Sequence, residues 1–119
     1  MVNRKVAVLR ADASSSIGVG HVMRSLSLGE ALIDEGFGVE LVSYELAPSL
    51  QSLATSCGIE VVELSCAPRS SEDAQFILQR NANLVVVDGY EFSCEFFAVL
   101  EADSTPFALV DDNAETNAQ

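Results

Sequence analysis

The chain has 119 residues, 49% of them hydrophobic, and carries a formal net charge of −12 at pH 7. This length and apolar content predict one globular domain with its own core and argue against a disordered chain. The acidic charge opposes binding to nucleic acid or to an anionic membrane through a general electrostatic field. The sequence shows no signal-peptide pattern at its start and no apolar run of membrane-spanning length, so we expect a cytoplasmic protein.

The hydrophobic pattern alternates between strands and helices along the chain. In chain order it predicts a strand at Val6–Arg10, a helix at His21–Glu35, a strand at Val39–Ser43, a helix at Pro48–Cys57, a strand at Ile59–Leu64, a helix at Ser71–Arg80, a strand at Leu84–Asp88, a helix at Ser93–Glu101 and a strand at Phe107–Val110. Pro48 suits a first helical turn, and Ser70 or Ser71 suits an N-cap. Glu72 and Asp73 then lie in the acidic first turn that a helix dipole favours.

Strands that alternate with helices predict an α/β fold: a Rossmann-like parallel sheet of about five strands, with right-handed crossovers and helices on both faces. The expected strand order is the common order 3-2-1-4-5, and residues 1–119 then form a single domain. A helix normally follows the last strand of such a sheet, whereas this chain runs out in polar residues after Asp111 and Asp112. Either the protein stops here or these residues are the front part of a longer one.

Two patterns bear on metals and cofactors. The three cysteines match no metal-ligand spacing and form no even set, so we expect reduced thiols and no metal site. The turn Gly18-Val19-Gly20 is similar to the start of a dinucleotide-binding fingerprint, but Met23 and Arg24 stand where the third glycine belongs. NAD is therefore not expected as a cofactor.

A ligand site is predicted where the strand order switches, between the first and fourth strands at their carboxyl ends. Topology brings polar residues from three loops to this edge: Asp12, Ser14–Ser16, Gly18, Gly20 and His21 after the first strand, Asp88, Gly89, Tyr90 and Glu91 after the fourth, and Asp111, Asp112 and Asn113 after the fifth. The aspartates at the strand ends are either turn formers, or they orient His21, Arg10 or Arg24 or bind sugar hydroxyls. Tyr90 is either a packing residue or presents its hydroxyl to the crevice.

The chain's only histidine, His21, lies at the start of the first predicted helix. A helix N-terminus disfavours an imidazolium, so we expect a neutral ring that can accept a proton; the alternative is a residue that only caps the helix or is satisfied in the core. Arg24, one turn further on, either reaches an anion or is solvated. Four of the six basic residues, Arg4, Lys5, Arg10 and Arg24, fall in the first 24 positions, so a local positive site can form near this turn.

Segments 10–14 (RADAS) and 17–32 (IGVGHVMRSLSLGEAL) closely resemble the opening of the UDP-sugar hydrolases of the pseudaminic acid pathway, which have relatives among spore-coat polysaccharide proteins. Segments 86–91 (VVDGYE) and 109–113 (LVDDN) fall where that family has similar strand-end motifs. The family hydrolyses UDP-2,4-diacetamido-2,4,6-trideoxy-β-L-altrose without a metal. The resemblance implies two Rossmann-like domains in a GT-B arrangement, of which this chain is the N-terminal one and the nucleotide-binding one is missing.

The resemblance also implies roles for residues. His21 is the general base that activates water, Tyr90 lines the sugar pocket, and Gly18 and Gly20 face the pyrophosphate or the sugar. Together with the strand-end residues, the predicted substrate-binding set is Asp12, Ser16, Gly18, Gly20, Arg24, Asp88, Tyr90 and Asp112. The expected function is hydrolysis of a UDP-linked amino sugar in polysaccharide biosynthesis, with no cofactor and with self-association or a separate C-terminal half as partner. The alternatives are a related glycosyltransferase, or a stand-alone binding or assembly module without catalysis.

Overall fold

The computed structural model describes residues 5–13, 20–89 and 92–110. In these residues strands and helices alternate: β1 (Val6–Arg10), α1 (Gly20–Asp34), β2 (Gly38–Ser43), α2 (Pro48–Ser56), β3 (Glu60–Glu63), α3 (Ser71–Leu78), β4 (Leu84–Asp88), α4 (Cys94–Ala102) and β5 (Phe107–Val110). The predicted bounds of β1, β4 and β5 are confirmed. The other elements begin or end one or two residues away from their predicted ends.

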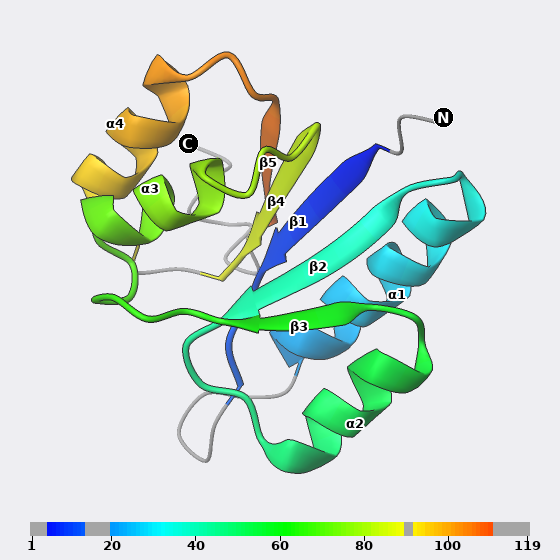
Figure 1. The fold of residues 1–119 in the computed structure, drawn as a ribbon. Coiled ribbons are helices and arrows are strands. Elements are labelled where there is room, and N and C mark those ends of the chain that lie inside the picture. Colours follow the sequence, from blue (N-terminus) through cyan, green and yellow to red (C-terminus); the bar gives the residue numbers. More distant parts are fainter. Residues whose placement is uncertain (1–4, 14–19, 90–91, 111–119) are drawn as a thin grey trace, which may run out of the picture.

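The strands form one parallel sheet in the order β3-β2-β1-β4-β5, so the predicted α/β fold and strand order are confirmed. Helices α1 and α2 lie on one face of the sheet, and α3 and α4 lie on the other (Figure 1). The order reverses between β1 and β4, where Ala7 pairs with Leu84 and Arg10 with Val87. The carboxyl ends of these two strands therefore lie side by side.

The central strand β1 supplies both cores of the domain. Ala7 and Leu9 are fully buried on the side of α1 and α2, and Val8 is fully buried on the side of α3 and α4. Alternate residues of a strand point to opposite faces, so a strand covered on both faces is apolar along its length. This explains why the run Val6–Leu9 contains no polar residue.

Helix α1 sits close to the sheet because it carries a glycine where the two meet. A Cβ atom at Gly29 would lie 2.6 Å from Cδ1 of Ile59 and 3.2 Å from Cδ1 of Leu9. Real Cβ atoms do not approach other atoms so closely, so a side chain here would push helix and sheet apart. Gly29 therefore allows α1 to pack closely against Leu9 of β1 and against Ile59.

Serine caps fix the starts of the two helices on the other face. The Ser70 hydroxyl accepts a hydrogen bond from the backbone N–H of Asp73 at 3.4 Å, and the Ser93 hydroxyl accepts one from Phe96 at 3.0 Å. The Ser70 cap was one of the two predicted. Ser93, predicted as the first residue of a helix, is instead its N-cap.

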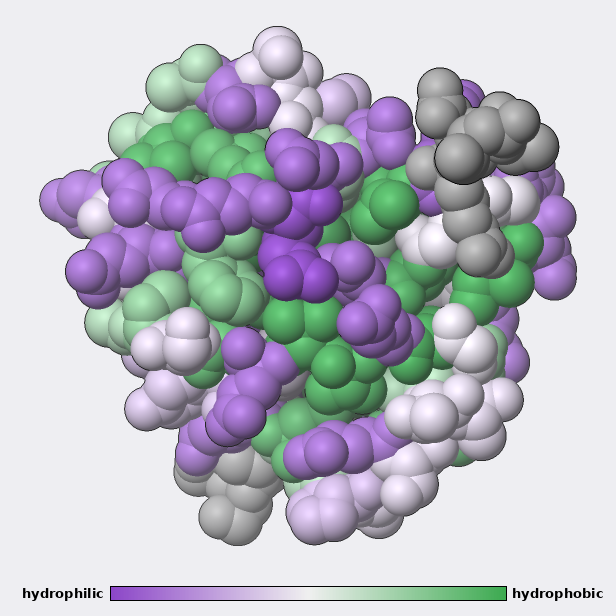
Figure 2. All heavy atoms as spheres, viewed as in Figure 1, coloured by the Kyte–Doolittle hydropathy of each residue, from purple (hydrophilic) through white to green (hydrophobic). Residues whose placement is uncertain are grey.

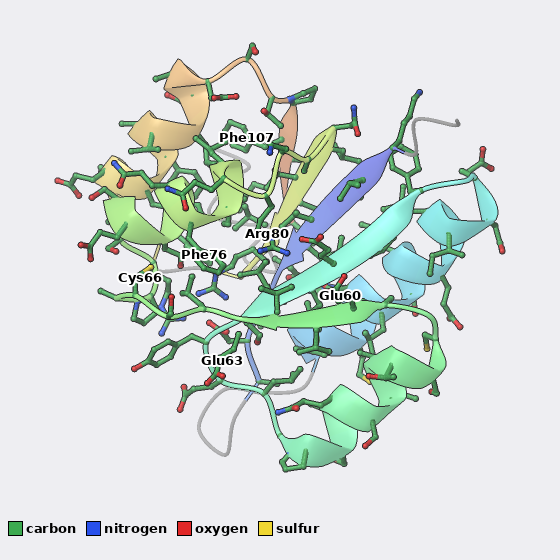
Figure 3. All side chains as sticks on the ribbon, in the orientation of Figure 1. Glu60, Glu63, Cys66, Phe76, Arg80 and Phe107 are labelled. Atoms are coloured by element: carbon green, nitrogen blue, oxygen red, sulfur yellow. The ribbon has the colours of Figure 1, made fainter. Side chains whose placement is uncertain are left out.

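Charged and aromatic contacts hold α3 and α4 to the sheet (Figure 3). Nε of Arg80, just after α3, donates to Oε1 of Glu40 in β2 at 2.8 Å. Phe107 of β5 stacks on Phe97 of α4, with ring centroids 6.5 Å apart.

In the view of Figure 1, hydrophilic side chains are spread over the surface of the molecule, with hydrophobic areas between them (Figure 2).

Candidate functional site

The candidate functional centre among the described residues is a histidine–aspartate pair. Nδ1 of His21, the second residue of α1, lies 2.7 Å from Oδ1 of Asp88, the last residue of β4. The pair is largely shielded from water, since 11% of the His21 side chain and 2% of the Asp88 side chain are exposed. A carboxylate accepts hydrogen bonds only, so the ring holds its proton on Nδ1 toward Asp88.

Arg24 braces the same carboxylate from one helical turn further along α1. Its Nη2 lies 2.8 Å from Oδ1 of Asp88, and its Nε lies 3.4 Å from Oδ2. Nη2 is also 3.0 Å from Nδ1 of His21, but both nitrogens carry hydrogens when Nδ1–H donates to Asp88. We therefore assign the hydrogen bond of Nη2 to the carboxylate. One buried aspartate thus receives donors from both a histidine and an arginine.

The arginine and the aspartate of this cluster differ in exposure. The Arg24 side chain is 42% exposed, whereas Asp88 is 2% exposed. Of these two charged groups, the guanidinium is therefore the one that is open to solvent. The formal charges of Arg24 and Asp88 balance each other.

A second charged network is buried behind this edge, around Arg10 at the end of β1. Nε of Arg10 donates to both carboxylate oxygens of Asp73 at 3.0 Å, and Nη2 donates to Oδ2 at 2.9 Å. Both side chains are fully buried. The Phe92 ring lies over the guanidinium, with its centroid 5.5 Å from Cζ. This bidentate ion pair connects the end of β1 to the first turn of α3.

Asp12 belongs to this network and is itself buried, at 5% exposure. Oδ1 accepts from the Ser43 hydroxyl at 3.0 Å and from the backbone N–H of Tyr44 at 2.6 Å, and Oδ2 accepts from Nη1 of Arg69 at 2.8 Å. Nη1 of Arg10 lies 2.9 Å from Oδ1 but is oriented so that it forms no hydrogen bond, so we treat this contact as an ion pair. These contacts engage both carboxylate oxygens within the protein and give Asp12 a structural role.

The mutual charges set the protonation of this network. Burial alone raises the pKa of Asp12, but the charge of Arg10 and the backbone N–H groups of Tyr44 and Glu45 outweigh it, so the pKa lies below its usual value. Burial alone lowers the pKa of Arg10, but its hydrogen bonds and charge contacts with Asp73 and Asp12 raise it above the usual value. Both groups stay ionised inside the protein.

The expectation of a local positive site built from four basic residues is wrong for two of them. Arg10 is fully buried and neutralised by Asp73 and Asp12. Lys5 lies just before the first residue of β1, at the amino ends of the strands, whereas the site lies at their carboxyl ends. Arg4 lies outside the described residues. Arg24 remains the basic residue that the structure places at the site.

Of the other predicted site residues, Gly20 is the exposed first residue of α1, and Ser16, Gly18, Tyr90 and Asp112 lie outside the described residues. Asp73, Arg69 and Ser43 complete the buried network and were not predicted as site residues. The only sequence signal at Asp73 is its place in the first turn of a helix. That signal is the same for a solvated acid and for one buried against an arginine.

A groove adjoins the histidine–aspartate pair, with a volume of about 450 Å³. It lies between α1 and the strands β4 and β5, and Arg24 and Asp88 are among its lining residues.

In the part of the chain that the structure describes, no group of three or more His, Cys, Asp or Glu side chains is placed to hold a metal ion. No helix in that same part has the length and apolar character to cross a membrane.

Solved structures that share this fold include a glycosyltransferase and a universal stress protein. A glycosyltransferase from Rickettsia africae ESF-5 aligns with 91% of this chain at a TM-score of 0.62 and 12% identity, and the chain spans 30% of that protein's length. A universal stress protein in complex with cAMP aligns with 91% of this chain at a TM-score of 0.58 and 19% identity, over 97% of its own length. No protein-family model and no curated protein matches the chain. At these identities the likeness establishes a Rossmann-like α/β fold and nothing finer.

Proposed function

We propose that this chain is the histidine-bearing domain of an enzyme that transfers a glycosyl group from a nucleotide-sugar to water, releasing the free sugar and UDP. The observation that carries the proposal is the 2.7 Å contact between His21 Nδ1 and Asp88 Oδ1 at the switch point of the sheet. The substrate class comes from the resemblance of the segments around His21 and Asp88 to the UDP-sugar hydrolases of the pseudaminic acid pathway. In that family a second domain supplies most of the nucleotide contacts.

The proposed chemistry follows from the proton positions. With Nδ1–H donated to Asp88, the acceptor nitrogen of the neutral ring is Nε2. Nε2 takes a proton from water while the water oxygen bonds to the anomeric carbon. The bond from that carbon to the pyrophosphate oxygen breaks, and UDP leaves with the electron pair. The N-terminus of α1 and the exposed guanidinium of Arg24 stabilise the negative charge that develops on the leaving group.

The test measures release of UDP from the UDP-linked diacetamido sugar by the unaltered protein and by its His21→Asn variant. General-base catalysis contributes roughly 10²–10⁴-fold, so the variant should lose turnover by that factor. UDP affinity, measured by calorimetry, should change little because the proposed nucleotide contacts lie mostly on the other domain. Near-normal turnover in His21→Asn would overturn the proposal. Transfer to an added sugar hydroxyl in preference to water would identify the related glycosyltransferase instead.

A non-catalytic nucleotide-binding module is the second candidate, and one observation favours it. The universal stress protein that was solved in complex with cAMP matches this chain over nearly its entire length, without a second domain. In this function the same edge of the sheet holds a nucleotide and nothing is hydrolysed. Tight binding of cAMP or UDP to this chain alone, with no turnover and no change on His21→Asn, would favour the module over the enzyme.

A further inference from the structure

We infer that a second copy of this chain packs against α1 and the groove beside it, with the two α1 helices antiparallel and crossing at Ser27. The groove is walled by Met23 and Leu28 of α1, Val86 of β4 and Val110 of β5. By two-fold symmetry, the same patch is buried on both copies. This interaction surface goes beyond the proposed function and does not depend on it.

Helix α1 is apolar on its solvent side as well as on the side that faces the sheet. Met23 is 42% exposed and Leu28 is 36% exposed. The small residues Ser27 and Ala31 are exposed on the same helix. A helix that meets only water on one side carries polar and charged residues there. An exposed apolar side is therefore typical of a surface that another element covers.

The sheet beside α1 is also incompletely covered. On this face, α1 packs on β1, β2 and β4, and α2 packs on β3. In β5, Ala108 is exposed and Val110 is half-buried on this same face, because Ala108 lies beside Val86 in the sheet and alternate residues of a strand share a face. A second α1 helix in the groove of about 450 Å³ covers this part of the sheet. The first α1 fills the same place in the second copy.

Charge selects the antiparallel orientation of the two helices. Glu30 and Asp34 lie in the second half of α1, and its first turn contains no acidic residue, so these charges oppose the dipole of their own helix. In an antiparallel pair that crosses at Ser27, Asp34 of one copy is level with Gly20 of the other, at the positive end of that helix. A parallel pair would instead place the two acidic halves side by side.

The same register matches large side chains with small ones. Ser27 meets Ser27 of the second copy at the crossing, where a small side chain permits a close approach of the two helices. Met23 and Ala31 are equally far from Ser27 in the sequence, so each methionine meets an alanine of the second copy. The interface needs no contact to Arg24, which keeps its ion pair with Asp88.

Sedimentation equilibrium of the unaltered chain tests whether the dimer forms. An interface of one helix and one strand is at the small end of the size range, below about 800 Å² per partner, so we expect a dissociation constant of about 1–100 μM. The measurement uses physiological ionic strength, at which the repulsion between two chains of charge −12 is screened. A monomer at all concentrations up to about 1 mM would overturn the inference and leave the groove to a different occupant.

Two matched variants test where the second copy binds. Leu28 and Leu53 are both exposed leucines on helices of this face, at 36% and 38%. Leu28→Ser should weaken the dimer at least tenfold, because a symmetric interface loses the side chain twice. Leu53→Ser, on α2, should leave the dissociation constant unchanged. Circular dichroism checks that both variants are folded. Equal effects of the two substitutions would overturn the inference.

Cysteine crosslinking tests the orientation, in a Cys94→Ser background that removes the exposed thiol. A disulfide needs Cα atoms within about 7 Å of each other. The antiparallel crossing brings the two copies of residue 27 together and separates the two copies of residue 31 by about 12 Å along the helix axis. On mild oxidation, Ser27→Cys should therefore form a covalent dimer and Ala31→Cys should not, with the linked peptides identified by mass spectrometry. Equal crosslinking at both positions, or none at position 27, would overturn the inference.

Discussion

His21 and Asp88 are 67 residues apart in the sequence, and their Nδ1 and Oδ1 atoms are 2.7 Å apart in the structure. The contact exists because β1 and β4 are neighbours in the sheet, so the helix that follows β1 starts beside the end of β4. Neither residue needs a flexible loop to reach the other, because one is in α1 and the other is in β4. Groups on regular elements hold their geometry more precisely than groups on loops.

Replacing Asp88 by asparagine should alter the tautomer of His21. A carboxylate accepts only, so it holds the ring proton on Nδ1, whereas an amide both donates and accepts and allows either tautomer. His21 is the only histidine, so its two ring nitrogens give unambiguous signals in a nitrogen-15 NMR spectrum at neutral pH. The native protein should show a single Nδ1–H form and Asp88→Asn a mixture. Asp103→Asn, after α4, is the control; identical spectra for all three proteins would contradict the assigned hydrogen bond.

Asp73→Ala should be strongly destabilising. It leaves the fully buried guanidinium of Arg10 without its main partner, and breaking one side of a buried ion pair costs about 3–5 kcal/mol. Glu72→Ala, one residue earlier and exposed, removes only a favourable charge near the helix start and should cost under about 1 kcal/mol. Urea unfolding of both variants measures the free energy of unfolding. Equal losses for the two would show that the Arg10 contacts add no stability.

Acid should destabilise the protein through Asp12. The pKa of Asp12 is lower in the folded chain than in the unfolded one, so the stabilisation is complete above the unfolded value, about 4. It is lost as the pH falls from there through the folded value. Asp12→Asn should therefore be less stable at pH 7 but show a flatter decline in unfolding free energy from pH 5 to pH 2. Glu63→Gln, at the exposed end of β3, should keep the steep decline.

Gly29→Ala tests the close approach of α1 to the sheet. Helix propensity alone favours alanine by about 1 kcal/mol. The added methyl group would lie 2.6 Å from Cδ1 of Ile59, which is buried and has little room to move, and overpacking costs roughly 1–3 kcal/mol. We expect a net loss of up to about 2 kcal/mol in thermal unfolding, the difference of these two contributions. Gly20→Ala is the matched control, since nothing lies within 4 Å of its added Cβ. A more stable Gly29→Ala protein would contradict the packing described.

The sequence allowed the fold to be predicted because each element has its own pattern. Val6–Arg10 and Leu84–Asp88 read as buried strands without any knowledge of the rest of the chain, and their bounds are confirmed. Helix α3 ends earlier than predicted: Asn81 has a φ of 58°, and the turn that leads to it begins after Leu78. A helical pattern continues through such a turn, so periodicity alone does not locate the end.

The candidate site could be predicted in part. Topology brought His21 and Asp88 to one edge, and the structure places them in contact. Arg24 was predicted either to reach an anion or to be solvated, and the structure pairs it with Asp88. The pairing of Arg10 with Asp73 could not be predicted from the sequence. The two residues are 63 positions apart, and their contact depends on how α3 packs on the face of the sheet opposite α1. The closeness of Lys5 and Arg10 in sequence suggested a shared positive surface. Lys5 is exposed at the start of β1, whereas Arg10 is buried at its end, so the two residues do not share a surface.

The parallel sheet also dictates an order of events during synthesis. Strand β1 has β2 and β4 as its neighbours, and Ala7 pairs with Leu84, so the second neighbour is made only after more than two thirds of the chain. Until then Val8 and Val42 lack the part of their core that β4 and α4 supply, which includes Val85 and Phe96. Pairings between distant segments form slowly and leave apolar surface open to aggregation while they wait. The nascent chain is therefore most dependent on chaperones in the interval between the completion of β2 and the emergence of β4 from the ribosome.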